Sequence, residues 1–189
     1  MKMDLHRVIA EEFPGLRVAV CANLPYYITS PMLMNLLESR LPVENITVMV
    51  QKEAALRLCA RPGTRECGAV TFAVRYYAEP EVLFPVSRGS FIPAPNVDSA
   101  VIRLTLRRKS PYPVTDEALL FCLVRAAFSQ RRKTLVNALS SAGWDKKAAA
   151  KILGEAGISE MARAEQLTLE QFVALGNAAA ESRKGKENT

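Results

Sequence analysis

Four consecutive residues, Asn23-Leu24-Pro25-Tyr26, carry groups that could hold a flat molecule with an amino substituent. The Asn23 side-chain oxygen can accept a hydrogen bond from an amine. Backbone carbonyls near Pro25 can point outward as further acceptors, because the residue before a proline is held extended. Tyr26 adds a planar face for stacking a nucleobase. Two acceptors on one exocyclic amine would direct its lone pair towards an electrophile. The competing interpretation is a plain strand-to-helix loop with a buried tyrosine.

The flanking residues predict a strand before this turn and a helix after it. The apolar run from Leu16 to Ala22 is typical of a parallel strand covered on both faces. Ser30 and Pro31 have the character of an N-cap and a first helical residue, in a helix that reaches about Leu41. The turn would therefore lie at the carboxyl end of a strand, where open α/β sheets bind their ligands.

A second segment, Phe91 to Ser99, contains closely spaced prolines and predicts a stiff, extended loop. Such a loop could present Phe91 opposite Tyr26 at low entropic cost, although most phenylalanines fill cores. Strands are predicted over 46–50, 81–88 and 102–106, and a helix over 51–60 with Ala55, Leu56 and Cys59 as its apolar positions. Residues 69–78 fit either a helix or a strand, and the helix is preferred.

Length and composition exclude several classes of protein. The 189 residues suffice for one sizeable domain, or for one domain with a small second one. The four cysteines are scattered and His6 is the only histidine, which argues against a zinc site, a disulfide framework or a Ser-His-Asp centre; no metal is expected. We find no apolar run that could span a bilayer and no signal-peptide pattern, so the expected location is cytoplasmic.

Beyond a proline-containing linker at residues 110–115 the pattern becomes entirely helical. Thr115 or Asp116 is expected to cap the first of these helices, and two more are expected to begin at Arg131 and Asp145. Thr168 and Gln171 are expected to form a capping box for the last helix. The polar tail that follows them is expected to be disordered.

The net charge of +6 favours a polyanionic partner. The positive charge is densest in two clusters, Arg107-Arg108-Lys109 and Arg131-Arg132-Lys133. Three cations in the first turn of a helix are locally unfavourable, and the second cluster therefore suggests an external anion such as phosphate. The alternative is a basic face that is only solvated.

Five runs of residues occur together in the sequence: Asn23 to Pro31, Gln51 to Glu53, Arg61 to Thr64, Phe91 to Ser99 and Phe128 to Leu135. In this order and spacing they resemble the motifs of the small-subunit ribosomal RNA adenine dimethyltransferases, the family tied to kasugamycin resistance. The resemblance extends from about Lys2 to Phe172. Each motif alone is weak, but five in register are specific. The erythromycin-resistance ribosomal RNA methylases share the first and fourth motifs but usually lack the second and third.

The resemblance implies an α/β fold, with part of a Rossmann-like methyltransferase sheet over residues 1–109 and a small all-α, RNA-binding domain over residues 110–189. It implies transfer of methyl groups from S-adenosylmethionine to the exocyclic amines of two adjacent adenines. These adenines lie near the 3′ end of the small-subunit ribosomal RNA, within a 30S precursor.

The resemblance also implies roles for individual residues. Asn23 and the carbonyl of Pro25 would hold the amine, while Tyr26 and Phe91 would clamp the flipped-out adenine. Asn23 would also lie beside the methyl group of the cofactor. Catalysis would then depend on positioning rather than on strong acid-base chemistry. The expected RNA-binding residues are Arg107, Arg108, Arg131, Arg132 and Lys133.

The sequence departs from the family pattern at its start. The family's glycine-rich loop, ribose-binding acidic residue and adenine-binding aspartate would all precede Met1. We therefore expect an N-terminally truncated, inactive chain with little affinity for S-adenosylmethionine; micromolar binding in calorimetry would contradict this. The strand ending at Ala22 would be a bare sheet edge, which invites formation of a non-native dimer.

Two alternatives from other classes stay open. One is a non-catalytic RNA-binding module that recognises the immature small subunit. The other is a DNA adenine methyltransferase, which uses a similar turn of an acidic residue or Asn, then Pro, then an aromatic residue. The cluster at Arg131 favours ribosomal RNA over DNA.

Overall fold

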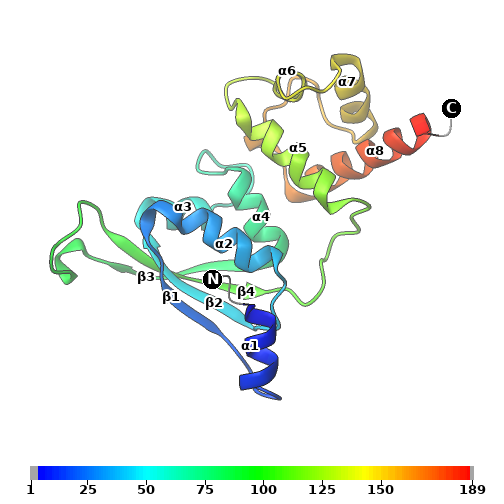
Figure 1. Ribbon diagram of the computed structural model, residues 1–189. Helices are drawn as coiled ribbons and strands as arrows, with labels where there is room; N and C mark the ends of the chain where they lie inside the picture. Colours follow the sequence, from blue (N-terminus) through cyan, green and yellow to red (C-terminus); the bar gives the residue numbers. More distant parts are fainter. Residues whose placement is uncertain (1–3, 188–189) are drawn as a thin grey trace. The chain divides into compact units, whose positions relative to one another are not determined.

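The computed structural model describes residues 4–187, which form two compact units (Figure 1). One unit contains the sheet and comprises residues 4–59 together with Ala73–Lys109. The other unit is helical and comprises Ala60–Phe72 and residues 110–187. The predicted division after residue 109 assigns Ala60–Phe72 to the sheet domain, but this segment packs with the helices because Phe72 is buried against Phe128 and Phe172.

Four strands form one mixed sheet in the order β1-β2-β4-β3. β1 (Val20–Asn23) runs parallel to β2 (Asn45–Gln51), whereas β4 (Ser99–Leu106) is antiparallel to both β2 and β3 (Ala78–Val86). The predicted α/β class, with a partial Rossmann-like sheet followed by helices, is confirmed.

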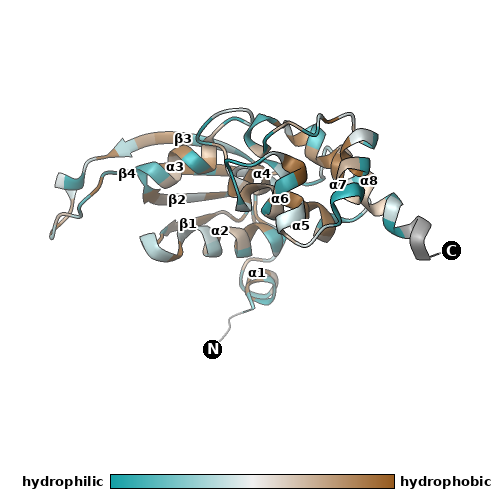
Figure 2. Cartoon of the chain, turned by 90° about the horizontal axis from the view of Figure 1, so that it is seen from above, coloured by the Kyte–Doolittle hydropathy of each residue, from teal (hydrophilic) through white to brown (hydrophobic). Residues whose placement is uncertain are grey.

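Alternate residues of the central strands form the core of the sheet unit. Ile46 and Val48 pair with Leu104 and Ile102, and all four side chains are buried, which accounts for the apolar colouring of β2 in Figure 2. The helices α2 (Thr29–Glu38) and α3 (Lys52–Cys59) lie along one face of the sheet (Figure 1). Burying one leucine there contributes roughly 1.5–3 kcal/mol. The two helices contribute Leu33, Leu37, Ala55 and Leu58 to this core.

The position of Leu56 was predicted wrongly. Leu56 is 53% exposed, whereas Leu58 is buried. The buried stripe of α3 follows the i, i+3 spacing of Ala55 and Leu58, so Leu56 lies outside the side that faces the sheet.

β1 is not covered on both faces, contrary to the prediction. It lies at the edge of the sheet, and its side chains alternate between half-buried and exposed, with Cys21 and Asn23 exposed. The physical reason is that packed side chains cover only one face of this strand. Asn23 consequently ends the strand on its open side.

The helix after the turn begins earlier than predicted. Tyr26–Ile28 form a short 3-10 helix, η1, that continues directly into α2, so Ser30 lies inside α2 and is not its N-cap. Pro31 is tolerated there because the first N–H groups of a helix need no acceptor within the helix.

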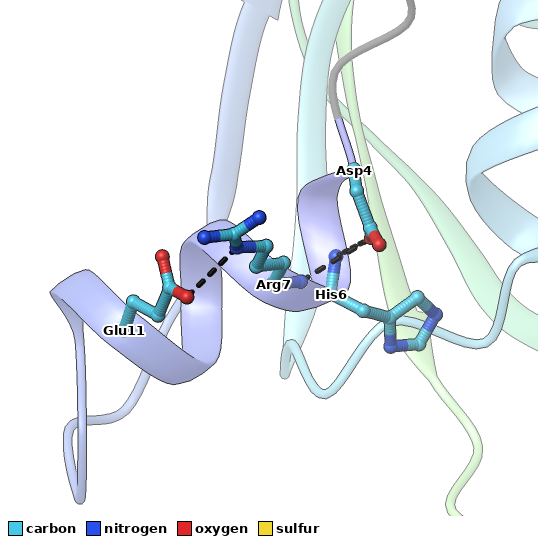
Figure 3. Close-up of polar contacts among 4 residues, drawn as sticks. All are labelled: Asp4, His6, Arg7 and Glu11. Carbon is cyan, nitrogen blue, oxygen red and sulfur yellow. Dashed lines mark hydrogen bonds and ion pairs between the residues drawn. The ribbon is translucent and has the colours of Figure 1, made fainter.

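α1 (Leu5–Glu12) is held by contacts at its first turn (Figure 3). The Asp4 carboxylate accepts hydrogen bonds from the backbone N–H groups of His6 and Arg7, at 3.0 and 3.2 Å. Arg7 and Glu11 form an exposed ion pair at 2.8 Å. The Nε2 atom of His6 lies 2.7 Å from the carbonyl oxygen of Ser39, so this histidine links α1 to the end of α2.

The thiol of Cys59, at the end of α3, is expected to react slowly with alkylating agents. Burial raises the pKa of this thiol to about 11, despite the opposing positive charge of Arg75. Because the thiolate is the nucleophile, iodoacetamide at pH 8 should label the exposed Cys21 and Cys122 well before Cys59. Peptide mass spectrometry over a time course measures the three rates, and equal rates would contradict the expectation.

The raised pKa of the Cys59 thiol also makes the stability of the fold depend on pH. The folded state keeps this proton to a higher pH than the unfolded state, whose thiol titrates near 9.0. The contribution of the protonated Cys59 thiol to stability is therefore complete below about pH 9 and is lost as the pH rises towards 11.

The helical unit contains part of α4 (Ala69–Tyr77), which confirms the helix predicted over 69–78. Two predicted caps are confirmed: Asp116 accepts from the N–H of Leu119 at 2.9 Å, and Thr168 and Gln171 form a reciprocal capping box at 2.9 and 3.3 Å. The other helices are α5 (Glu117–Ser129), α6 (Leu135–Ser141), α7 (Lys146–Glu155), the short 3-10 helix η3 (Ala164–Gln166) and α8 (Leu169–Glu187).

Two predictions for this unit are wrong. The helix expected to begin at Arg131 begins at Leu135, because Arg131–Lys133 form a turn in which the N–H of Lys133 bonds to the carbonyl of Gln130 at 2.9 Å. The tail expected to be disordered continues α8 as far as Glu187, and residues 188–189 lie outside the described part of the chain. No helix within residues 4–187 combines the length and apolar character needed to cross a bilayer.

Candidate active site

A pocket of about 310 Å³ lies at the carboxyl end of β1, and it brings together the four residues that the sequence singled out. Tyr26 and Phe91 are both half-buried, so neither is sealed in a core as the competing interpretations had it. Residues more than 60 positions apart thus share one site. The lining residues are Asn23, Leu24, Pro25, Tyr26, Phe91, Pro93 and Pro95.

Asn23 is placed by the sheet. It is the last residue of β1, it pairs with Met49 of β2, and its side chain is exposed. The N–H of the next residue, Leu24, donates to the carbonyl of Met49 at 3.2 Å and extends the pairing by one residue. A side-chain amide held on a rigid strand end can accept a hydrogen bond with little further loss of conformational entropy.

The carbonyl of Pro25, which was expected to hold the amine, is already occupied. It accepts hydrogen bonds from the N–H of Ile28 at 3.1 Å and from the hydroxyl of Thr29 at 3.2 Å. A carbonyl oxygen has two lone pairs, and both are used inside the turn that starts η1 and α2. The role given to the Pro25 carbonyl is therefore corrected; its ring still lines the pocket.

The carbonyl of Leu24 is the free acceptor of this turn. Leu24 lines the pocket, and its carbonyl accepts no hydrogen bond from any residue in the range 4–187. The sequence indicated only that some carbonyl near Pro25 could serve as an acceptor, and did not single out that of Leu24. The useful signal was the proline itself, because it holds the preceding residue extended.

The Tyr26 side chain is held in place by a contact with β4. Its hydroxyl lies 2.6 Å from the hydroxyl of Ser99, which is fully buried at the start of β4. Ser99 also ends the loop that carries Phe91, so one hydrogen bond connects the turn to the loop. Ser99 belongs to one of the sequence motifs, but spacing along the chain could not show its contact with Tyr26.

The loop that presents Phe91 is closed at its base. A short 3-10 helix, η2 (Arg88–Ser90), precedes Phe91, and the N–H of Arg88 donates to a carboxylate oxygen of Asp98 at 3.0 Å. The carbonyl of Asp98 accepts from the N–H of Lys52 at 3.0 Å, which attaches the loop to the start of α3. The Ile92–Pro93 peptide bond is cis. These contacts give the half-buried Phe91 a defined place beside the turn.

The basic residues expected to bind RNA are not equivalent. In the helical unit, the Arg131 guanidinium donates to the carbonyls of Arg65 and Cys67, at 2.5 and 3.1 Å. Arg131 therefore holds the segment 60–72 to the turn after α5. Arg132 and Lys133 are exposed, and Lys133 makes one long contact to Ser141 at 3.4 Å.

In the sheet unit too, one basic residue is bound within the fold and the next is exposed. Arg107 pairs with Glu79 at 3.0 Å and also bonds to the carbonyl of Arg75, and only 29% of its side chain is exposed. Arg108, the next residue, is exposed. Arg107 thus mainly ties β4 to β3, while Arg108 is available to a partner.

We expect Arg131→Gln to reduce stability and the pair Arg132→Gln and Lys133→Gln to reduce RNA affinity. Loss of charged hydrogen bonds to two carbonyls should lower the free energy of unfolding by about 1–2 kcal/mol. Loss of phosphate contacts should instead flatten the salt dependence of RNA binding by about one unit of slope per contact. Urea denaturation and salt titrations measure the two effects, and a purely electrostatic effect of Arg131→Gln would contradict the structural role.

Comparison with solved structures defines the class of protein. A dimethyladenosine transferase from Plasmodium falciparum is 26% identical, with a TM-score of 0.72 over 92% of this chain and 69% of that one. The 23S rRNA methyltransferase ErmE, 24% identical with a TM-score of 0.63, shares the fold over 88% of this chain and 67% of that one. The fold is that of the Rossmann-like ribosomal RNA methyltransferases.

The sequence itself narrows this class. Residues 1–181 match the family described as ribosomal RNA adenine dimethylase, and the chain belongs to that family. Proteins named ribosomal RNA small subunit methyltransferase A from Geobacillus sp. (strain WCH70) and Bacillus mycoides (strain KBAB4) are each 50% identical over 183 residues, or 94% of this chain. The chain spans 63% of the length of these relatives.

Members of this family use S-adenosylmethionine. Of the residues that line the pocket, Asn23 could contact the methyl-bearing end of that molecule, but none is a carboxylate that could hold its ribose hydroxyls. The lining residues fit an adenine and its amine, not the whole cofactor. Within residues 4–187 no three His, Cys, Asp or Glu side chains gather as ligands for a metal ion.

Proposed function

We propose that the protein with this chain dimethylates the exocyclic amines of two adjacent adenines in small-subunit ribosomal RNA, using S-adenosylmethionine. The observation that supports this most is the shared pocket of Asn23, Leu24, Tyr26 and Phe91 at a strand end. The pocket offers two acceptors and two rings, which are the groups that an adenine amine and an adenine ring require. The family membership supports the same reaction.

The pocket would act by positioning the base. An adenine flipped out of its stack would lie between Tyr26 and Phe91. In the first transfer, the side-chain oxygen of Asn23 and the carbonyl of Leu24 would each accept one N–H bond from the amine, which leaves the nitrogen lone pair directed at the methyl group that S-adenosylmethionine supplies when bound. The nitrogen gains the methyl group as the bond from that group to sulfur breaks, and it then releases one proton to water. The second transfer starts from the methylated amine, whose one remaining N–H bonds to one of the two acceptors. Fixing the reacting atoms in line removes much of the entropic barrier without an acid or a base.

A chimera tests this function. In it, the 183 residues of the Geobacillus relative that match this chain are replaced by those of this chain. We expect the chimera to incorporate two methyl groups into each of two adenines of unmethylated 30S precursor particles, which mass spectrometry of the digested RNA detects. Methylation of duplex DNA in preference to the particles would overturn the proposal, as would particle binding by a stably folded chimera without methylation. For such a substrate we propose a cytoplasmic location.

We also propose that the chain associates through β1. Both edges of the sheet are unpaired within residues 4–187, but β3 carries two prolines and a bulge near Val82, which discourage pairing. β1 carries no such protection. Sedimentation velocity should show a dimer that Cys21→Lys weakens, whereas a monodisperse monomer at high concentration would contradict this proposal.

A further inference from the structure

The loop that presents Phe91 also lines a second groove. This groove has a volume of about 490 Å³ and is called here the Lys52 groove. The loop lines both hollows, with Phe91, Pro93 and Pro95 in the first pocket and the next three residues in the groove. The residues of the groove that matter below are Lys52, Leu56, Arg88, Asn96, Val97 and Asp98.

The groove holds two cationic side chains with no partner. Lys52 and Arg88 are exposed, and neither charged group has a hydrogen-bond or ion-pair partner among residues 4–187. Of the two carboxylates that line the groove, Glu53 pairs with Arg57 at 2.8 Å, whereas Asp98 accepts the backbone N–H of Arg88 at 3.0 Å and keeps its negative charge. Together with Arg57 the groove therefore has one cation in excess, and Lys52 and Arg88 can contact an anion.

The groove also has an apolar floor and an unused amide. Leu56 and Val97 are 53% and 43% exposed, although both are large apolar side chains. Asn96 is exposed, and its amide has no partner in the described part of the chain. A side-chain amide can form two hydrogen bonds with the edge of an adenine that carries N6 and N7. A phosphate site, a flat apolar surface and such an amide together suit one nucleotide.

From this we infer that the Lys52 groove binds the RNA nucleotide adjacent to the adenine in the first pocket. Lys52 and Arg88 contact its phosphate, its base lies on Leu56 and Val97, and Asn96 favours adenine as that base. This inference rests on the proposed function. It explains how two neighbouring adenines are kept apart by one stiff loop while one of them is held for methylation.

Competition binding with the 189-residue chain tests this inference. A fluorescein-labelled single-stranded hexanucleotide containing two adjacent adenines is the probe, and AMP and the dinucleotides ApA, ApU and UpA are unlabelled competitors. We expect ApA to compete at least tenfold better than AMP and better than ApU or UpA. The double variant Lys52→Gln, Arg88→Gln should weaken ApA about tenfold, leave AMP unchanged, and flatten the salt dependence by about 0.7 per lost single-strand phosphate contact.

Two control variants make the outcomes distinguishable. Lys109→Gln removes an exposed cation of the same unit that does not line the groove, and it should leave every competitor unchanged. Phe91→Ala should weaken both AMP and ApA. If the double variant behaves like Lys109→Gln while Phe91→Ala keeps its effect, the inference fails and the proposed function survives.

The other outcomes are equally decisive. If Phe91→Ala has no effect on any competitor, the adenine pocket fails and the inference fails with it. Equal competition by ApA, ApU and UpA would overturn the adenine preference assigned to Asn96. Because all the altered side chains of the groove are exposed, unchanged thermal unfolding of each variant confirms that folding does not confound the comparison.

Discussion

The substitution Asn23→Ala in the chimera is expected to lower turnover by about 100-fold or more, because it removes one preorganised acceptor from the reacting amine. The Leu24 carbonyl would remain, but a single acceptor holds the amine less firmly in the geometry that exposes its lone pair. The lone pair would then point at the methyl group in only a small fraction of bound states. The defect should lie in the chemical step, since the two rings that bind the adenine are untouched.

Single-turnover methylation of 30S precursor particles, at saturating S-adenosylmethionine, measures this effect directly. Asn35→Ala is a suitable control, because Asn35 is an exposed asparagine of α2 that does not line the pocket. The control should keep full turnover. If Asn23→Ala retained wild-type turnover as well, the hydrogen-bonding role of Asn23 would have to be abandoned.

Phe91→Ala is expected to weaken adenine binding by about 1–3 kcal/mol, the usual loss when a base loses an aromatic stacking partner. Tyr26 would still stack on one face, and its ring would stay in place because Ser99 holds its hydroxyl at 2.6 Å. The effect should therefore appear in the affinity for RNA containing the two adenines. Equilibrium binding to such an RNA measures it, and Phe91→Tyr should restore most of the affinity.

Phe84→Ala provides the matched control for this experiment. Phe84 belongs to β3 and is 53% exposed, but it does not line the pocket. Both substitutions remove an aromatic ring from the same unit of the protein, although Phe84 is exposed and Phe91 is half-buried. Equal losses for Phe84→Ala and Phe91→Ala would show that general hydrophobic contact, and not stacking in the pocket, accounts for the binding.

Much of the fold follows from short-range patterns. The alternation of Ile46, Val48 and Val50 predicts β2, and Asp116 predicts the start of α5, because both signals depend on residues a few positions apart. The predictions fail where packing from another segment decides the outcome. Ala60–Phe72 joins the helical unit through Phe72, and one face of β1 stays open because nothing in residues 4–187 covers it.

The candidate site, like the fold, was predictable from the sequence only in part. The sequence motifs predicted that Asn23, Tyr26 and Phe91 belong to one site, and in the structure all three line one pocket. The sequence could not predict which carbonyl is free. The Pro25 carbonyl accepts its hydrogen bonds from Ile28 and Thr29 only once η1 and α2 have formed.

The sequence by itself determined the chemical groups of this protein, the order of its helices and strands, and its membership of a ribosomal RNA adenine dimethylase family. These depend on residue type and local spacing. Only the tertiary structure decided how those groups are engaged: Leu24 and not Pro25 has the free carbonyl, and Arg131 but not Arg132 is bound to backbone carbonyls. The reason is that a lone pair or an N–H donor that bonds to a distant residue of the fold is no longer available to a ligand.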